Sequence, residues 1–133
     1  MVELYTKIVF ENYANFKGRA SRIEYLSFII TGFIILILSM LLGVVIGGVF
    51  DDPLGGIVIG YGLFTIYVIF TFLPGLGLTV RRLHDIGKSG HYLIIPIYIL
   101  ILACANGQKG SNQYGDDPKN QLEDLGQIDE GFN

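Results

Sequence analysis

The sequence predicts an all-α integral membrane protein with an amphipathic amino-terminal helix, three transmembrane helices and a polar, partly disordered carboxy-terminal tail. Hydrophobic residues make up 51% of its 133 residues and charged residues only 16%, which is the apolar extreme for a soluble domain. Three stretches, 25–50, 53–80 and 89–108, contain no Asp, Glu, Lys or Arg. Each is long enough to supply the roughly 20 helical residues that cross a bilayer core. A chain this small could not bury all three in a soluble fold.

The first 17 residues predict a helix that lies on the membrane surface. Apolar and aromatic side chains recur on one arc at the helical period: Tyr5, Ile8, Val9, Tyr13 and Phe16. Charged side chains lie opposite, with the spacing that allows ion pairing along a helix: Glu3, Lys7 and Glu11. Such a helix suits the interface, where tyrosines lie among the headgroups. Packing on the protein's own cytoplasmic loop is an equally good interpretation.

The first transmembrane helix is expected at about 25–50 and the second at about 54–80. Ser21 followed by Glu24 fits a capping box, in which each side chain accepts a hydrogen bond from the other residue's backbone N–H. This pair predicts where the first of these helices begins. Asp51, Asp52 and Pro53 predict the turn between the two helices, since proline is well accepted at the first helical position.

The third transmembrane helix is expected at about 90–106 and is the weakest of the three. His91, Pro96 and Asn106 interrupt its apolar residues, so an interfacial or re-entrant segment is the alternative. One membrane domain is then expected at 1–119, followed by an acidic tail at 120–133. The tail has few aromatic residues and a net negative charge, which predicts disorder.

Basic residues indicate the orientation in the membrane. Seven of them precede the first predicted span or lie between the second and the third: Lys7, Lys17, Arg19, Arg22, Arg81, Arg82 and Lys88. The turn between the first two spans has none, and the tail has only Lys109 and Lys119. Because basic loops stay in the cytoplasm, three crossings place the amino terminus inside and the carboxy terminus outside. If the third stretch re-enters instead, the tail returns to the cytoplasm.

Two pairs of glycines predict close packing between helices. Gly43 and Gly47 lie on one face of the first predicted span, and Gly56 and Gly60 on one face of the second. In lipid, small residues at this spacing let helices approach closely. The two faces could pack against each other, or they could form a homodimer.

The densest polar residues form a candidate functional or structural cluster on the predicted cytoplasmic face. Its members are Arg19, Arg22, Glu24, Arg81, Arg82, His84, Asp85 and Lys88. Cations at the end of a helix complement its dipole and help to set the topology. Glu24 could pair with Arg81 or Arg82, which would leave other cations for anionic lipid headgroups.

The same residues give little support to chemistry. Gly87, Lys88 and Ser89 resemble the end of a phosphate-binding loop, but the glycine that the pattern needs is replaced by Arg82. His84 beside Asp85 has no predicted nucleophile, and only one other histidine, His91, exists. We therefore expect no enzyme activity, no cofactor, no metal and no nucleic-acid partner. The spans also lack the ionisable residues that ion-coupled transport uses.

Three segments together resemble the bacterial inner-membrane family catalogued as domain of unknown function 805. They are residues 16–25 (FKGRASRIEY), 81–90 (RRLHDIGKSG) and 112–118 (NQYGDDP). The chain departs from the family pattern at His91 and Tyr92, where an aromatic pair is usual, and at Asp116, where proline is usual. The resemblance implies a multi-pass protein of the bacterial inner (plasma) membrane with no established reaction.

The expected function is that of a non-enzymatic membrane interaction or envelope component. The lipid bilayer, anionic headgroups, other membrane proteins or further copies of the chain are the expected partners. A subunit of a small oligomeric transporter or channel is the alternative, because the glycine faces could assemble several copies. A lipid-headgroup-modifying enzyme is the third hypothesis.

Overall fold

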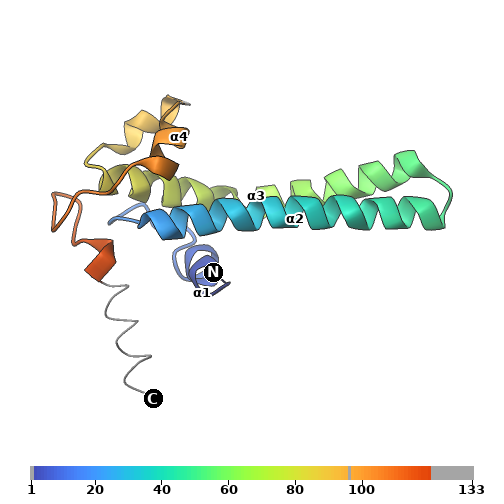
Figure 1. Ribbon diagram of the computed structural model, residues 1–133, viewed down its shortest axis with the longest axis horizontal. Helices are drawn as coiled ribbons and strands as arrows, with labels where there is room; N and C mark the ends of the chain where they lie inside the picture. Colours follow the sequence, from blue (N-terminus) through green and yellow to red (C-terminus); the bar gives the residue numbers. More distant parts are fainter. Residues whose placement is uncertain (1, 96, 121–133) are drawn as a thin grey trace, which may run out of the picture.

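A computed structural model describes residues 2–95 and 97–120, and every regular element in this part of the chain is a helix. A short helix α1 (Val2–Thr6) continues into a π-helical turn η1 (Lys7–Glu11). Two long helices follow, α2 (Arg22–Val49) and α3 (Pro53–Asp85). A 3₁₀ helix η2 (Gly90–Ile94) and a short helix α4 (Ile97–Cys104) come last. The long helices form an extended antiparallel hairpin (Figure 1).

Both long helices begin where the sequence predicts. Ser21 is the N-cap of α2, and its side chain and that of Glu24 form the complete capping box. Asp52 caps α3, and Pro53 is the first residue of that helix. Both helices are long and apolar enough to cross a membrane. The second helix is longer than predicted and continues to Asp85, so Arg81 and Arg82 lie on its last turns and not in a loop.

Glycine ends α3. Gly87 has a φ of +76°, a left-handed conformation that favours glycine. Its amide donates to His84 O at 3.0 Å, and the amide of Lys88 donates to Leu83 O at 2.9 Å. These two bonds satisfy carbonyl groups that the helix leaves without partners at its end. The chain therefore reverses just beyond the basic turn of α3.

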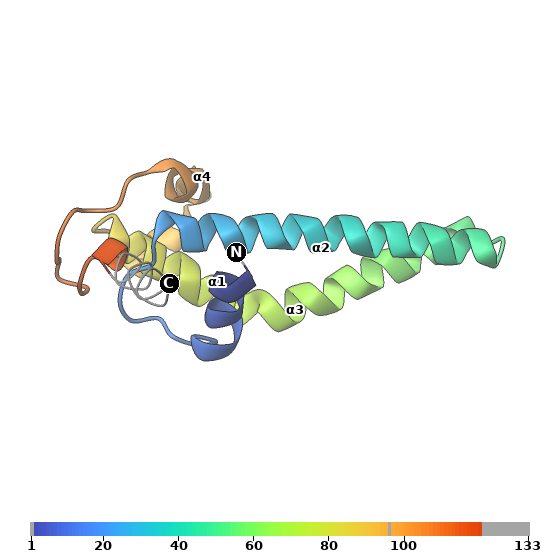
Figure 2. The same ribbon diagram turned by 60° about the horizontal axis from the view of Figure 1, so that its bottom comes forward.

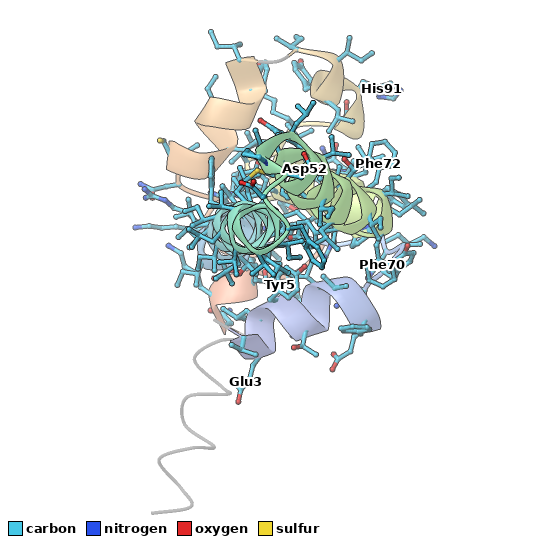
Figure 3. All side chains as sticks on the ribbon, turned by 90° about the vertical axis from the view of Figure 1, so that its right-hand side faces the viewer. Glu3, Tyr5, Asp52, Phe70, Phe72 and His91 are labelled. Carbon is cyan, nitrogen blue, oxygen red and sulfur yellow. The ribbon has the colours of Figure 1, made fainter. Side chains whose placement is uncertain are left out.

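The hairpin has two parts with different surroundings. We call residues 30–73 the distal part, which consists of the facing lengths of α2 and α3 and the turn between them (Figure 2). Only at its near end do side chains of the amino-terminal segment reach it, where Tyr5 contacts Tyr67 and Tyr13 contacts Phe70 among the described residues. We call the other described residues the base. There α1 and η1 lie across one face of the helix pair, and η2 and α4 lie across the opposite face (Figure 3). The buried hydrophobic core lies in the base and comprises Ile8, Ala20, Tyr25, Leu78, Leu83 and Leu102.

The four glycines of the predicted packing faces meet in the distal part. A Cβ atom built on Gly43 would lie 2.4 Å from the carbonyl oxygen of Gly56, and one built on Gly47 would lie 3.1 Å from the Cα atom of Gly56. A Cβ atom on Gly60 would lie 3.0 Å from the carbonyl oxygen of Ser39. In this arrangement the glycine faces of α2 and α3 pack against each other within one chain.

The amino-terminal helix is shorter than the predicted arc. It ends at Glu11, so Tyr13 and Phe16 lie beyond it. Ile8 and Val9 are buried against the hairpin, while Glu3 points away from it (Figure 3). Pro74 has no N–H to donate to the carbonyl of Phe70 one turn earlier, and the hydroxyl of Tyr13 donates to that carbonyl at 3.0 Å. A proline inside α3 thus provides a binding point for the amino-terminal segment.

The stretch predicted as a third transmembrane helix over 90–106 does not form one helix. It contains the five residues of η2 and the eight residues of α4, with an extended residue, Ile95, after η2. Eight helical residues span about 12 Å, less than half of a bilayer core. Proline at position 96 of the sequence cannot supply the N–H that a continuous helix needs there. Instead of extending away from the base, α4 packs against both α2 and α3.

The start of the tail also differs from the three-span arrangement. Because the third stretch folds back, residues 105–120 return to the end of the hairpin where α2 begins and α3 ends (Figure 1). There the amide of Gln108 donates to Asp85 O at 2.8 Å. Residues 105–120 therefore lie beside the amino-terminal loop, whereas three crossings would place the two on opposite sides of the membrane. The predicted acidic segment from 121 onward lies outside the described residues.

Candidate functional site

Two arginines share one buried aspartate at the base. The Nε atom of Arg19 donates to Oδ1 of Asp85 at 3.0 Å, and its Nη2 atom lies 2.8 Å from the same oxygen. Arg82 pairs with the other oxygen, Oδ2, from one turn earlier in α3. The three side chains are at most 4% exposed. A buried charge is tolerated only when it is paired, and here one carboxylate serves two cations from distant parts of the chain.

Arg82 connects α3 to two other segments. It donates through Nε to the carbonyl of Leu102 at 3.0 Å and also bonds to the carbonyl of Ala105. A longer bond of 3.5 Å reaches the carbonyl of Ala20, just before α2. The orphan carbonyls at the end of a helix need donors, and a planar guanidinium supplies several in a fixed geometry. Arg82 therefore holds the end of α4 against α3.

Arg19 makes the corresponding connection to the tail. Besides Asp85, it binds the carbonyl groups of Gln108 and Gly110, and that of Gly115 lies at 3.5 Å. The cluster that the sequence predicted as a functional or structural group on the cytoplasmic face is in this respect an internal junction. It gathers the amino-terminal loop, the end of α3 and the tail.

His84 holds the tail from the other side. Its ring stacks on Tyr114 with a centroid distance of 4.0 Å and an interplanar angle of 1°. Its Nδ1 atom lies 3.0 Å from the carbonyl oxygen of Gly18. The side-chain amide of Asn112 donates to the carbonyl of His84 at 3.0 Å. His84 is thus placed to bind the tail, while the adjacent Asp85 pairs with the two arginines.

The tail closes into a turn of its own beside the cluster. Asn112 and Gly115 form an isolated antiparallel bridge. The carboxylate of Asp117 accepts a hydrogen bond from the amide of Lys119 and one from the amide of Gly110, both at 3.0 Å. These bonds, chiefly the one from Lys119, hold the pKa of Asp117 below its ordinary value because they favour the charged form. Ionisation of Asp117 therefore favours the turn.

Arg81 and Glu24 do not take part in the buried trio of Arg19, Arg82 and Asp85. Glu24 accepts a hydrogen bond from the amide of Ser21 at 2.7 Å and so belongs to the cap of α2. Arg81 is 6% exposed, and its Nε and Nη2 atoms find no hydrogen-bond partner among the described residues. Both side chains line a cavity of about 230 Å³ between the amino-terminal segment, the hairpin and the tail. We call it the Arg81 cavity.

The structure brings together most of the predicted cluster. Arg19, Arg82 and Asp85 are in contact, His84 lies beside them on the tail side, and Arg81 and Glu24 line the neighbouring cavity. Lys88 lies apart, with its Nζ atom 5.4 Å from the centre of the Tyr92 ring. Arg22 lines a separate cavity on the other side of Arg82 and Asp85.

Sequence reasoning missed three contributors to the site. Lys7 and Lys17 line the Arg81 cavity, and Tyr114 stacks on His84. The conspicuous tail segment 112–118 was a usable signal, because its polar and turn-forming residues stand out after an apolar stretch. The interpretation that the amino-terminal helix packs on the cytoplasmic loop brought this segment near Arg81, but it did not single out Lys7 and Lys17, since their position depends on how the segment folds back.

The described side chains of the site offer groups for binding. Within residues 2–95 and 97–120, no group of three His, Cys, Asp or Glu side chains is placed to hold a metal ion. The hydroxyl of Ser21 accepts the amide of Glu24 and so serves the helix cap. What the site does offer is a set of cations beside a cavity.

The family model described as "Protein of unknown function (DUF805)" matches residues 13–116, so the chain belongs to this family. Among curated proteins, the inner membrane protein YhaI of Escherichia coli (strain K12) is 37% identical over 122 residues, covering 84% of this chain and 92% of the relative. The inner membrane protein YhaH of the same strain is 36% identical over 125 residues, covering 89% of this chain and 98% of the relative. No solved structure matches the chain.

Proposed function

Since its relatives are inner membrane proteins, we propose that this protein is a non-enzymatic component of the bacterial inner membrane. In this proposal the hairpin crosses the bilayer and the folded base binds at its cytoplasmic surface. The observation that carries the proposal is the buried trio of Arg19, Arg82 and Asp85. Its charges are used to hold four chain segments together, which is the chemistry of a scaffold.

The distribution of exposed apolar side chains supports the position of the bilayer. Large exposed hydrophobic residues run without a long break from Ile30 to Phe50 and from Leu54 to Leu73. These lengths of about 20 residues match a hydrocarbon core about 30 Å thick. Between Leu73 and Ile94 there is no exposed large hydrophobic residue. The boundary between lipid and headgroups is therefore proposed to lie near Leu73.

The charge distribution supports the orientation. All nine Lys and Arg residues belong to the base, and the charged residues of the distal turn, Asp51 and Asp52, are both acidic. Under the positive-inside rule, this favours a cytoplasmic base. The amino-terminal loop and the tail up to residue 120 would then both face the cytoplasm, with two crossings in place of three.

The segments on either face of the base are proposed to lie in the interface. Val2 and Phe10 are exposed on the amino-terminal side, and Ile94 and Ile97 on the side of η2 and α4. Apolar side chains on short helices at this depth can insert among the headgroups and upper acyl chains. Together they would fix the tilt and depth of the hairpin.

Labelling of single cysteines tests the proposal. In a Cys104→Ser background, Asp51→Cys should react with a membrane-impermeant maleimide added to spheroplasts, and Ser111→Cys should react only after the membrane is permeabilised. Asp51 lies in the distal turn and Ser111 is exposed in the tail. Labelling of Ser111→Cys in intact spheroplasts would overturn the two-crossing arrangement.

The alternative hypothesis, a subunit of an oligomeric transporter or channel, is now less well supported. That alternative depended on the glycine faces, and both are used between α2 and α3 of one chain. A further copy would have to pack on the exposed large side chains of the distal part, which lack the small-residue stripe that drives close association in lipid.

A further inference from the structure

We propose that the Arg81 cavity is a binding site for a phosphate-type oxyanion, either the headgroup phosphate of an anionic lipid or free phosphate. The proposal deepens the function proposed above, because the lipid source requires the base to lie at the membrane surface. The free-phosphate source does not require it.

The first observation is the excess of positive charge in the cavity lining. Four cationic side chains line the cavity, Lys7, Lys17, Arg19 and Arg81, against two carboxylates, Glu24 and Asp116. Arg19 pairs with Asp85, which leaves three cations against the two carboxylates, and Glu24 also caps α2. Asp116 accepts the hydroxyl of Ser111 at 3.0 Å. An anion that enters the cavity therefore meets an excess of positive charge.

The second, independent observation is that two nitrogen atoms of the Arg81 guanidinium lack a hydrogen-bond partner among the described residues, although Glu24 partly balances the charge of Arg81. Arg81 is more than nine-tenths buried, and its Nε and Nη2 atoms lack acceptors among the described residues. Buried donors almost always have a partner. These two atoms lie on the same edge of the guanidinium, the edge that binds two oxygens of one carboxylate or phosphate.

The size and walls of the cavity favour a phosphate. A volume of about 230 Å³ is several times the roughly 30 Å³ that one water molecule occupies in the liquid. A carboxylate would satisfy the fork of Arg81 with its two oxygens and leave Lys7 and Lys17 without an acceptor. A phosphate has further oxygens for the two lysines.

Arg81 is held in position for this role. Its carbonyl accepts the amide of Ala20 at 3.1 Å, which joins the end of α3 to the start of α2. The amino-terminal segment closes the cavity from the side through Asn12 and Asn15, and the tail through Gly115 and Pro118. A bound anion would thus connect the same segments that the buried trio connects, and binding should raise the melting temperature.

Thermal unfolding of the full chain in nanodiscs tests the site. In nanodiscs of phosphatidylcholine alone, inorganic phosphate should raise the melting temperature saturably, compared with chloride at equal ionic strength, if the ligand is free phosphate. If the ligand is a lipid, added phosphatidylglycerol should raise it instead, and native mass spectrometry should detect the retained lipid. Failure of both to stabilise the wild-type protein would overturn the proposal.

Matched variants separate this site from general charge effects. Arg81→Gln should weaken binding about tenfold or more, because a hydrogen-bonded charge is removed. The double variant Lys7→Gln/Lys17→Gln should also weaken it, and it tests the site even if Arg81→Gln does not fold, since Lys17 is exposed. Lys109→Gln/Lys119→Gln makes the same change in charge outside the cavity and should bind normally. Equal weakening by both pairs would overturn the site.

The anion-binding experiment and the cysteine-labelling experiment can fail independently of each other. Cysteine labelling reports the side of the membrane on which the tail lies, whatever the cavity binds. If labelling contradicts a cytoplasmic base but phosphate still stabilises the protein through Arg81, the site stands and the proposed function fails. If labelling supports it and neither anion binds, the scaffold remains and the site is wrong.

Discussion

The distal part of the hairpin buries only small residues, whereas the base buries large and charged ones. Between residues 30 and 73 the buried positions are Ser39, Gly43, Gly47, Gly56, Gly60 and Thr71. In the base, the largest fully buried side chains are Arg82, Ile8, Leu78, Leu83 and Leu102, with Val9 and Pro74. The two parts belong to the same pair of helices but are held together by different forces.

The difference follows from the surroundings proposed for each part. In lipid, apolar side chains gain little by leaving the hydrocarbon, so helices associate through close backbone packing and large side chains can face outward. In contact with water, burial of large apolar residues is the main favourable term. The base adds a paired charge network, which is costly to break. Substitutions in the distal part and in the base should therefore lower the stability by different amounts.

The largest effect is expected from Asp85→Ala. The substitution leaves Arg19 and Arg82 buried without their shared carboxylate. Loss of one member of a buried ion pair costs about 3–5 kcal/mol of unfolding free energy. The whole of this loss is expected in the base. Equilibrium unfolding in detergent measures the loss, and Glu3→Ala, at an exposed acidic position, is the control. Similar stability for the two variants would show that the trio contributes little.

A smaller loss is expected from Gly56→Ala in the distal part. The added methyl group would lie 2.4 Å from the carbonyl oxygen of Gly43, so the two helices must separate. Overpacking of this kind costs about 1–3 kcal/mol. Gly62→Ala makes the same change on α3 where nothing lies within 4 Å, and it should be neutral. The assay is equilibrium unfolding, or disulfide trapping between α2 and α3. If the two variants give the same result, the close packing of α2 and α3 is contradicted.

The smallest effect is expected from Ser21→Ala, at the border between the amino-terminal loop and α2. The variant loses the hydrogen bond from the amide of Glu24, which is 3.2 Å long. Removal of such a cap costs about 1 kcal/mol, measured by unfolding as above. Ser89→Ala is the matched control, because Ser89 occupies the N-cap of η2 without a side-chain cap bond. A larger loss from the control would contradict the assigned role of Ser21.

Local signals were enough for the hairpin itself. Charge-free stretches, the capping pair of Ser21 and Glu24, and the turn before Pro53 predicted two long helices and where each of them begins. Such features depend on residues within one or two helical turns, or on the composition of one stretch. The third stretch shows the limit of this reasoning. Its apolar composition predicted a crossing, but α4 is too short for one and packs on the base.

By itself, then, the sequence determined that the chain is helical and apolar, where its two long helices begin, and which cationic residues form the basic end. Only the tertiary structure decided which acid balances those cations. Arg19 and Asp85 are 66 positions apart, and Glu24, expected to pair with Arg81 or Arg82, caps α2 and interacts electrostatically with Arg81 alone of these two. Pairing over such a separation depends on how the third stretch and the tail fold back, and local sequence carries no signal for that return.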